Sequence, residues 1–227
     1  MAKPAPFTFS SLETFINCGK QYYHKYVLKD VKDEPGPAQI YGTNTHEHFE
    51  NYINSLGKYE LPEDLLPHKE KLDQLLAKDG VFWCEEEVAL GKDLKPCRYD
   101  DADRLWRGKI DFRLVDRDEH SATLVDFKTG KQRIKWPQLG IYALHTFAAF
   151  PNVEIINAQF YWTQLRETTK KVWGRGDIEQ IWLMFLGDLR QYKEAWKNDT
   201  WQERPSGLCN GWCPVKTCQH WKPRRER

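Results

Sequence analysis

Hydrophobic residues recur at helical spacing in five parts of the chain. Between residues 12 and 26 they follow Ser10 and Ser11, which predicts a helix with a serine near its N-cap. The stretch 30–39 holds two prolines and a glycine and predicts a loop. The same helical spacing predicts further helices over residues 42–56, 62–78 (kinked at Pro67), 137–150 and 177–197.

Other segments are rich in β-branched and aromatic residues, which favour strands. They predict strands over residues 81–90, 104–116, 121–130, 153–164 and 169–175. The chain from Asp199 onward has no periodicity but contains three of the six cysteines. The expected fold class is therefore α+β or α/β, with a mixed β-sheet flanked by helices and a cysteine-rich C-terminal tail.

Composition narrows the class of protein. Hydrophobic residues make up 40% of the chain and charged residues 30%, and their interspersion argues against disorder. The formal net charge is +1, so a polyanion would have to bind at local basic patches. No signal peptide and no run of about 20 apolar residues is seen, so we expect a soluble, cytoplasmic protein. In a reducing compartment the cysteines are expected to be metal ligands or free thiols.

Two strands predict a pair of neighbouring carboxylates. If the turn runs from Asp116 to Ser121, antiparallel pairing places Asp111 opposite Asp126. Lys128 then lies on the same face, because side chains alternate along a strand. Two such carboxylates repel each other, and a hard divalent cation such as Mg²⁺ or Mn²⁺ between them removes the repulsion. The alternative is a solvated Asp–Lys surface pair, which is common in proteins.

Two helices add residues of suitable chemistry. His46 and Glu50 are one helical turn apart and share a face, as a metal ligand and a group that orients it. Gln138 and Tyr142 have the same spacing on the helix after the lysine strand. Each pair alone is also explained by an ordinary surface or core helix.

Five segments, in order, resemble the RecB-like branch of the PD-(D/E)XK nuclease superfamily. FSSLETFINCGKQYYHKYV resembles its opening helix, GTNTHEHFE its G-x-x-x-H motif and GKIDF its G-x-(I/V)-D strand. VDFKTG resembles the (D/E)-x-K strand and QLGIY the Q-x-x-x-Y motif. The resemblance covers nearly the whole chain and implies a restriction-endonuclease-like core. The catalytic residues that it implies are His46, Asp111, Asp126, Lys128, Gln138 and Tyr142, with Mg²⁺ or Mn²⁺ held by His46, Asp111, Asp126 and the Phe127 carbonyl.

Some relatives, including the CRISPR-associated exonucleases and the AddB nuclease domain, carry an iron–sulfur cluster. The resemblance assigns a [4Fe–4S] cluster here to Cys18, Cys209, Cys213 and Cys218. The tail spacing is C-x3-C-x4-C, whereas the relatives more often have C-x2-C-x5-C. A structural Zn²⁺ site formed by the three tail cysteines and His220 is the alternative. The expected organisation is a single nuclease domain, 1–227, with a core of about 40–198 and with 1–39 and 199–227 forming an iron–sulfur staple.

The function implied is a metal-dependent DNA exonuclease, acting 5′→3′ on single-stranded ends with some endonuclease activity. The DNA substrate would contact the segment after the catalytic strand, where Lys131, Arg133 and Lys135 supply positive charge and Trp136 can stack on a base. The relatives act in recombination, repair, phage DNA processing and CRISPR adaptation, some of them phage-encoded, so helicase, recombination or adaptation proteins are the partner classes. The alternatives are a non-catalytic DNA-binding or complex-forming subunit on the same scaffold, and a zinc-tailed interaction protein.

Overall fold

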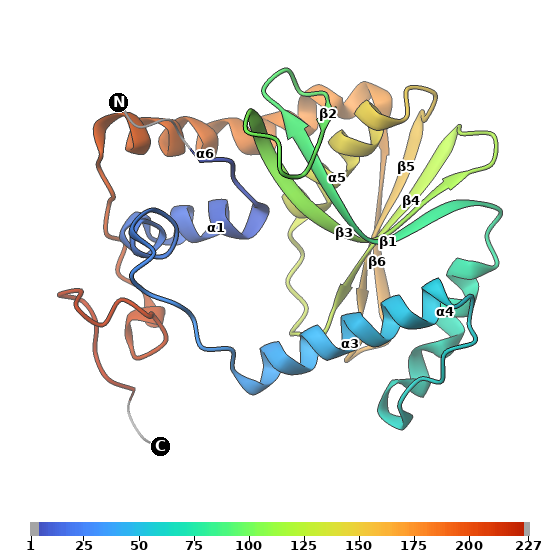
Figure 1. Cartoon of the computed structure of the whole chain (residues 1–227), viewed down its shortest axis with the longest axis horizontal. Helices are drawn as coiled ribbons and strands as arrows, with labels where there is room; N and C mark the ends of the chain where they lie inside the picture. The colour runs from blue at the N-terminus through green and yellow to red at the C-terminus, as the bar shows by residue number, and fades with distance from the viewer. Residues whose placement is uncertain (1–4, 225–227) are drawn as a thin grey trace. The chain divides into compact units, whose positions relative to one another are not determined.

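The computed structural model describes residues 5–224 and contains a six-stranded sheet (Figure 1). Its spatial order is β2-β1-β3-β4-β5-β6. The bounds are β1 (Gly80–Gly91), β2 (Pro96–Cys97), β3 (Arg104–Asp116), β4 (Ser121–Lys128), β5 (Ile155–Trp162) and β6 (Glu167–Gly174). Strands β4 and β5 pair in parallel and every other neighbouring pair is antiparallel. The mixed sheet confirms the predicted fold class, although the short strand β2 was not predicted.

The helices largely follow the predicted pattern. Their bounds are α1 (Phe9–Asn17), α2 (Gly19–Tyr22), the π-helix η1 (Tyr23–Leu28), α3 (Pro37–Asn54), the 3₁₀ turn η2 (Glu63–His68), α4 (Lys69–Leu76), α5 (Trp136–Ala149), the 3₁₀ turn η3 (Arg175–Asp177), α6 (Ile178–Asn198) and the 3₁₀ turn η4 (Gly207–Cys209). Helix α3 begins at Pro37, within the predicted loop, because proline suits the first helical position. Pro67 lies in the 3₁₀ turn before α4, so the segment predicted as one kinked helix is divided.

The chain divides into two compact units. One unit comprises residues 35–184 and contains the sheet with α3, α4 and α5; the other comprises residues 1–34 and 185–227. In the second unit, aromatic rings form the interior, and the hydroxyl groups of Tyr22 and Tyr192 lie 2.6 Å apart. The ring of Trp201 stacks on Tyr22 with a centroid distance of 5.6 Å. Within the described residues, no helix is both long enough and apolar enough to cross a membrane.

The core of the sheet unit determines which way the acidic side chains point. Phe112 on β3 and Phe127 on β4 are buried in one cluster with residues of α3 and α4, including Phe49. Side chains alternate along a strand, so the neighbouring Asp111 and Asp126 point to the opposite side. The rings of Phe49 and Phe127 meet edge to face at 5.0 Å, and this contact stabilises the strand whose next residue is Lys128.

Candidate functional site

Asp111 and Asp126 face each other across the β3–β4 hairpin. The pairing of Phe112 with Val125 sets the register that opposes the two aspartates, as predicted from the turn length. Both carboxylates are buried, with only 8% and 2% of the residue surface exposed. The Phe127 backbone N–H donates a hydrogen bond of 2.7 Å to Oδ2 of Asp111. The hairpin therefore places two carboxylates in an environment with little water, where their charges interact strongly.

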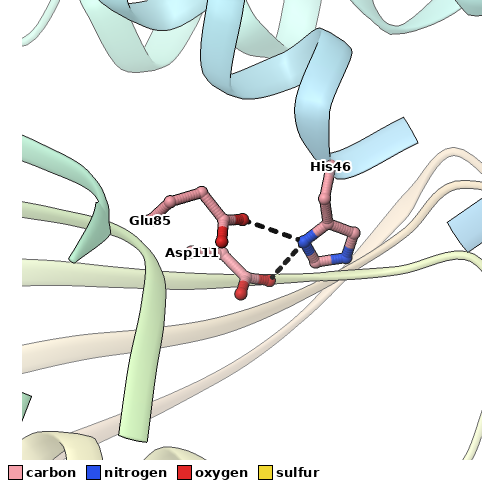
Figure 2. Close-up of side chains that lie close together, drawn as sticks. All are labelled: His46, Glu85 and Asp111. Carbon is pink, nitrogen blue, oxygen red and sulfur yellow. Dashed lines mark hydrogen bonds and ion pairs between the residues drawn. The ribbon is translucent and has the colours of Figure 1, made fainter. Parts of the chain in front are cut away.

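His46 reaches this hairpin from helix α3. Its Nε2 lies 3.0 Å from the Phe127 carbonyl oxygen, and its Nδ1 lies 3.1 Å from Oε1 of Glu85. The same Nδ1 is 3.6 Å from Oδ2 of Asp111 (Figure 2). The imidazole thus lies among two carboxylates and a backbone carbonyl, all of which are oxygen ligands suited to hard divalent cations.

A glycine allows α3 to come this close. Gly42 lies one helical turn before His46, and a Cβ built on it would be 2.9 Å from Oγ1 of Thr129. Thr129 immediately follows Lys128 at the end of β4. A larger residue at position 42 would require the Thr129 side chain to move, so the glycine of the G-x-x-x-H pattern lies against the end of the strand that His46 contacts.

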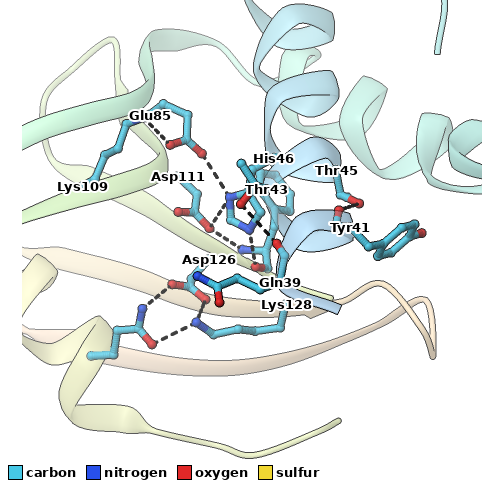
Figure 3. A network of polar contacts seen from close by, with 12 residues as sticks. Gln39, Tyr41, Thr43, Thr45, His46, Glu85, Lys109, Asp111, Asp126 and Lys128 are labelled. Carbon is cyan, nitrogen blue, oxygen red and sulfur yellow. Dashed lines mark hydrogen bonds and ion pairs between the residues drawn. The ribbon is translucent and has the colours of Figure 1, made fainter. Parts of the chain in front are cut away.

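An unusual backbone conformation at Glu85 places its side chain in the site. It lies opposite Asp111, between the pairs Cys84–Phe112 and Glu86–Ile110, and its φ is 51°. A left-handed conformation costs a non-glycine residue roughly 1–2 kcal/mol. Lys109 Nζ lies 2.8 Å from the second oxygen of Glu85 (Figure 3). The contacts with His46 and Lys109 offset this cost.

Lys128 and Gln138 form a second half of the site around Asp126. The Nε2 of Gln138 donates to Oδ1 of Asp126 at 2.8 Å, and its Oε1 accepts from Lys128 at 2.9 Å. Lys128 Nζ also lies 2.6 Å from Oδ2 of Asp126. That oxygen has an ion-pair contact but no well-aligned hydrogen-bond donor among the described residues. Lys128 therefore balances part of the charge of Asp126, and Gln138 holds both groups in place.

Tyr142 is buried on helix α5. It is 6% exposed and its ring lies 6.0 Å from that of Trp106. Burial raises the pKa of its hydroxyl well above the ordinary value, and the charges of Asp126 and Asp111 raise it further. Tyr142 is therefore a neutral group that lies close to the acidic pair.

The charges in the site shift one another's pKa values. Burial raises the pKa of Asp111, and the neighbouring charge of Asp126 raises it further. Burial lowers the pKa of His46, but Asp111 and Glu85 outweigh this effect and raise the value to about 9. Burial also raises the pKa of Asp126, against the opposing effect of Lys128. The negative charge of the carboxylates is therefore only partly balanced by neighbouring groups, and a divalent cation would balance the rest.

The donor set fits such a cation. One ligand atom each from His46, Glu85 and Asp111 lie within 4.8 Å of one another. Asp126 lies outside this group of three but influences the pKa of His46 electrostatically. Of the four predicted ligands, His46 thus contacts two, Asp111 and the Phe127 carbonyl. The structure adds Glu85 as a further candidate ligand.

A pocket of about 490 Å³ opens beside these residues. Its lining includes His46, Glu50, Glu85 and Lys109. Glu50, predicted to orient His46, shares this pocket, but the carboxylate hydrogen-bonded to the imidazole is Glu85. The sequence signal for Glu85 is weak, because a run of three glutamates (residues 85–87) in a strand does not show which one faces inward.

The predicted DNA-contacting residues follow β4. Lys131 and Arg133 are exposed, and Lys135 and Trp136 are half-buried. The Trp136 ring packs 5.5 Å from Phe160, and Lys171 lies 5.5 Å from its centre. Part of the Trp136 ring is therefore packed against the protein, and only the remaining part is accessible to a DNA base.

The four cysteines assigned to a cluster line one pocket in the unit formed by residues 1–34 and 185–227. Its lining includes Cys18, Cys209, Cys213 and Cys218. Burial raises the pKa of the Cys213 thiol; a backbone hydrogen bond lowers it, and the three other thiols raise it further. Cys84 and Cys97 are free thiols in the other unit, where the core cluster packs against Cys84.

Comparisons with known proteins identify the family of this chain. The sequence model of the PD-(D/E)XK nuclease superfamily matches residues 6–218. A protein of Eubacterium rectale, provisionally named an exonuclease, has a similar fold with 10% identity and a TM-score of 0.50, covering 98% of this chain and 90% of that one. The crystal structure of SSO0001 aligns with 11% identity and a TM-score of 0.47, covering 96% and 88%. A search of curated proteins finds no match.

At 10% identity the Eubacterium rectale structure indicates the fold alone. The family match spans most of the chain and includes the hairpin aspartates, Lys128 and His46. The chain therefore belongs to the PD-(D/E)XK nuclease superfamily.

Proposed function

We propose that this chain is a Mg²⁺- or Mn²⁺-dependent deoxyribonuclease of the RecB-like type that degrades DNA from its ends. The observation that carries the proposal is the convergence of His46, Glu85, Asp111 and the Phe127 carbonyl beside Asp126 and Lys128. Four of these six groups are oxygen donors of the kind that Mg²⁺ and Mn²⁺ prefer.

These residues would hold one or two divalent ions. When bound, such ions supply Lewis-acid chemistry and lower the pKa of a water molecule. His46 must lose a ring proton to act as a ligand, and its raised pKa makes this loss harder until cationic charge is present. Glu85 and Asp111 offset the charge around the imidazole and hold its ring in place.

Lys128 is the residue that acts on the scissile phosphate or on the attacking water. Its ammonium group is oriented by Gln138 and Asp126, which leaves a further N–H for a substrate oxygen. A positioned cation of this kind stabilises negative charge that develops on a phosphate. Gln138 is hydrogen-bonded to both Asp126 and Lys128. It therefore fixes the distance between Asp126, a proposed metal ligand, and Lys128, the proposed catalytic residue.

The preference for single-stranded ends and for 5′→3′ polarity rests on the sequence resemblance. Lys131 and Arg133 offer exposed positive charge beside the end of β4, where a phosphate backbone would be bound. A protein of similar fold is provisionally named an exonuclease, which supports action at DNA ends but bears on neither strandedness nor polarity. Some endonuclease activity is compatible with an open pocket.

The test is digestion of DNA labelled separately at its 5′ and 3′ ends, in single- and double-stranded form, with Mg²⁺ or Mn²⁺. Lys128→Ala is the matched control, and we expect it to lose activity. The order in which the labels are released gives the polarity. Equal digestion by the wild-type protein and by Lys128→Ala would assign the activity to a contaminant and refute the proposal.

We also propose that Cys18, Cys209, Cys213 and Cys218 hold a [4Fe–4S] cluster. Four thiols around one pocket fit the usual ligand number of such a cluster. The N–H of Ser206 donates to Sγ of Cys209 at 3.5 Å, a type of contact that tunes cluster sulfurs.

The presence of Cys18 in the pocket supports the cluster over a zinc site formed by the tail alone. A tetrahedral zinc site needs sulfurs about 3.8 Å apart. Within the described residues, however, the tail cysteines and His220 do not place three ligand atoms within 4.8 Å of one another. His220 instead contacts Glu203 at 2.9 Å. The same pocket is lined by Cys18 together with the three tail cysteines and His220, and a tail-only zinc site would not need Cys18.

A further inference from the structure

One face of the sheet carries basic residues that the proposed active site does not use. Strands β4, β5 and β6 present to this face Thr123, Gln159 and Lys170, which lie near one another through the pairs Val125–Gln159 and Gln159–Lys170. It is the side on which Phe127 packs, opposite to Asp126 and Lys128. Lys170 is exposed on β6, so part of this face is open to solvent.

Helix α4 and the residues after it add two further lysines. Lys71 Nζ donates to Oε1 of Gln159 at 3.1 Å, and Lys78 Nζ donates to Oγ1 of Thr123 at 2.9 Å. Both acceptors are neutral and buried, with exposures of 6% and 2%. An ammonium group has three donors, so each lysine is positioned by the protein while further donors remain for a ligand.

The three lysines lack counter-charges. No ion pair joins Lys71, Lys78 or Lys170 to a carboxylate within residues 5–224. The carboxylate of Asp79, next to Lys78 in the sequence, lies 2.8 Å from Arg117 instead. The residues that β4, β5 and β6 place on this face are not acidic; they are Ser121, Thr123, Val125 and Phe127 on β4, Ile155, Asn157, Gln159 and Tyr161 on β5, and Thr168, Lys170 and Val172 on β6. On the neighbouring strand β3 the same face carries Asp116, which accepts a hydrogen bond from Ser121.

The like charges act on one another. Burial lowers the pKa of Lys71 to about 8, and the charges of Lys170 and Lys78 lower it further. Three ammonium groups are therefore gathered closely enough to repel one another. Glu70 and Asp79 are next to Lys71 and Lys78 in the sequence, but their carboxylates contact Gln74 and Arg117 instead. Within the described residues the three ammonium groups therefore have no ion-pair partner, which leaves them available to an anionic ligand from outside the chain.

We propose that Lys71, Lys78 and Lys170 form a second phosphate-binding surface, which contacts the backbone of a nucleic-acid strand away from the site of cleavage. The inference rests on the proposed function for the identity of the polyanion but does not require cleavage. Lys170 comes from strand β6, and Lys71 and Lys78 come from α4 and the residues after it, with both of their ammonium groups hydrogen-bonded to residues of this sheet face. Contacts between lysines and phosphates position a strand without reading its bases.

The test measures binding without cleavage. A fluorescein-labelled oligo(dT) is titrated in EDTA with the Lys128→Ala protein, and fluorescence anisotropy is followed over a range of salt concentrations. The triple variant Lys71→Gln, Lys78→Gln, Lys170→Gln is made in the same background. We expect its affinity to fall about tenfold at low salt, and the slope of log K against log salt to become shallower by about 2, because three phosphate contacts are lost.

A matched control removes the same charge at the other edge of the sheet. Lys92, Lys95 and Arg98, in the segment from the end of β1 to the start of β3, are changed to glutamine, and this variant should bind like the parent. The lysine-cluster variant should keep the parent's melting temperature or exceed it, because like-charge repulsion is relieved. Unlabelled polyglutamate at equal charge should compete poorly.

Three results would overturn the inference: unchanged binding by the cluster variant, an equal loss in the control, or equal competition by polyglutamate. These outcomes are separate from those of the digestion experiment. If binding depends on the three lysines but no Lys128-dependent cleavage is found, only the proposed function is refuted. If cleavage depends on Lys128 but the triple lysine variant binds DNA as well as its parent, only this inference is refuted.

Discussion

Nδ1 of His46 lies 3.1 Å from Oε1 of Glu85, whose backbone has the left-handed φ of 51°. The two residues come from helix α3 and strand β1, which are connected through η2 and α4. A conformation that costs free energy in the folded state persists only where neighbouring contacts hold it. This contact therefore links a strained strand residue to the predicted metal ligand.

Replacing Glu85 with glutamine should weaken divalent-ion binding about 10- to 100-fold, the usual effect of removing a group that holds or orients a ligand. Binding of Mn²⁺ by isothermal titration calorimetry measures this change. Glu50→Gln is the matched control, since Glu50 lines the same pocket without a hydrogen bond to His46. An equal loss of affinity in both variants would show that only the general negative charge of the pocket matters.

The part of the site built on the β3–β4 hairpin could be predicted from the sequence. A short turn from Asp116 to Ser121 fixes the register, so the opposition of Asp111 and Asp126 followed from counting residues. Gln138 and Lys128 could be placed near each other for a similar reason, because the helix follows the strand after a short loop. Contacts local in sequence are the ones that spacing can determine.

Glu85 could not be predicted in the same way. The connection between β1 and β3 is long and contains the short strand β2, so spacing does not set the register of that pair. The left-handed conformation of Glu85 depends on His46 and Lys109, which are distant in sequence. Helix α3 also begins at Pro37 rather than after the loop, since two nearby prolines indicate a loop as readily as a helix start.

Gly108→Ala should destabilise the protein by about 1–3 kcal/mol, the usual cost of overpacking. A Cβ at this position would lie 2.5 Å from the Trp106 ring and 3.1 Å from the Tyr142 ring. Urea denaturation measures the change in the free energy of unfolding. Gly130→Ala is the control, because nothing lies within 4 Å of its added Cβ; similar stabilities for the two variants would contradict the packing argument.

Cys18→Ser should abolish the iron content of the purified protein together with its visible absorption. The reason is that Cys18 is the one ligand of the proposed cluster that lies far from the tail in sequence, and three thiolates hold such a cluster less well than four. Anaerobic purification followed by iron and sulfide analysis measures the loss. Cys97→Ser serves as the control; full iron content in Cys18→Ser would show that the ligand assignment is wrong.

The pH dependence of stability should reveal a buried neutral histidine. His145 is 5% exposed, and Nη1 of Arg113 lies 3.2 Å from its Nδ1. Burial lowers the pKa of His145 to about 3, and the charge of Arg113 contributes to the lowering. An unfolded histidine has a pKa of about 6.5. The unfolded state therefore takes up a proton between about pH 6.5 and pH 3 that the folded state does not.

Uptake of that proton makes the free energy of unfolding fall as the pH drops below about 6.5, by up to about 1.4 kcal/mol per pH unit from this group. Above pH 6.5 the contribution is constant. His145→Asn keeps a hydrogen-bond acceptor for Arg113 but cannot titrate, so its stability should fall less steeply between pH 6.5 and pH 4.5 than that of the wild type. Urea denaturation at several pH values measures both slopes, and parallel curves for the two proteins would rule out His145 as the titrating group.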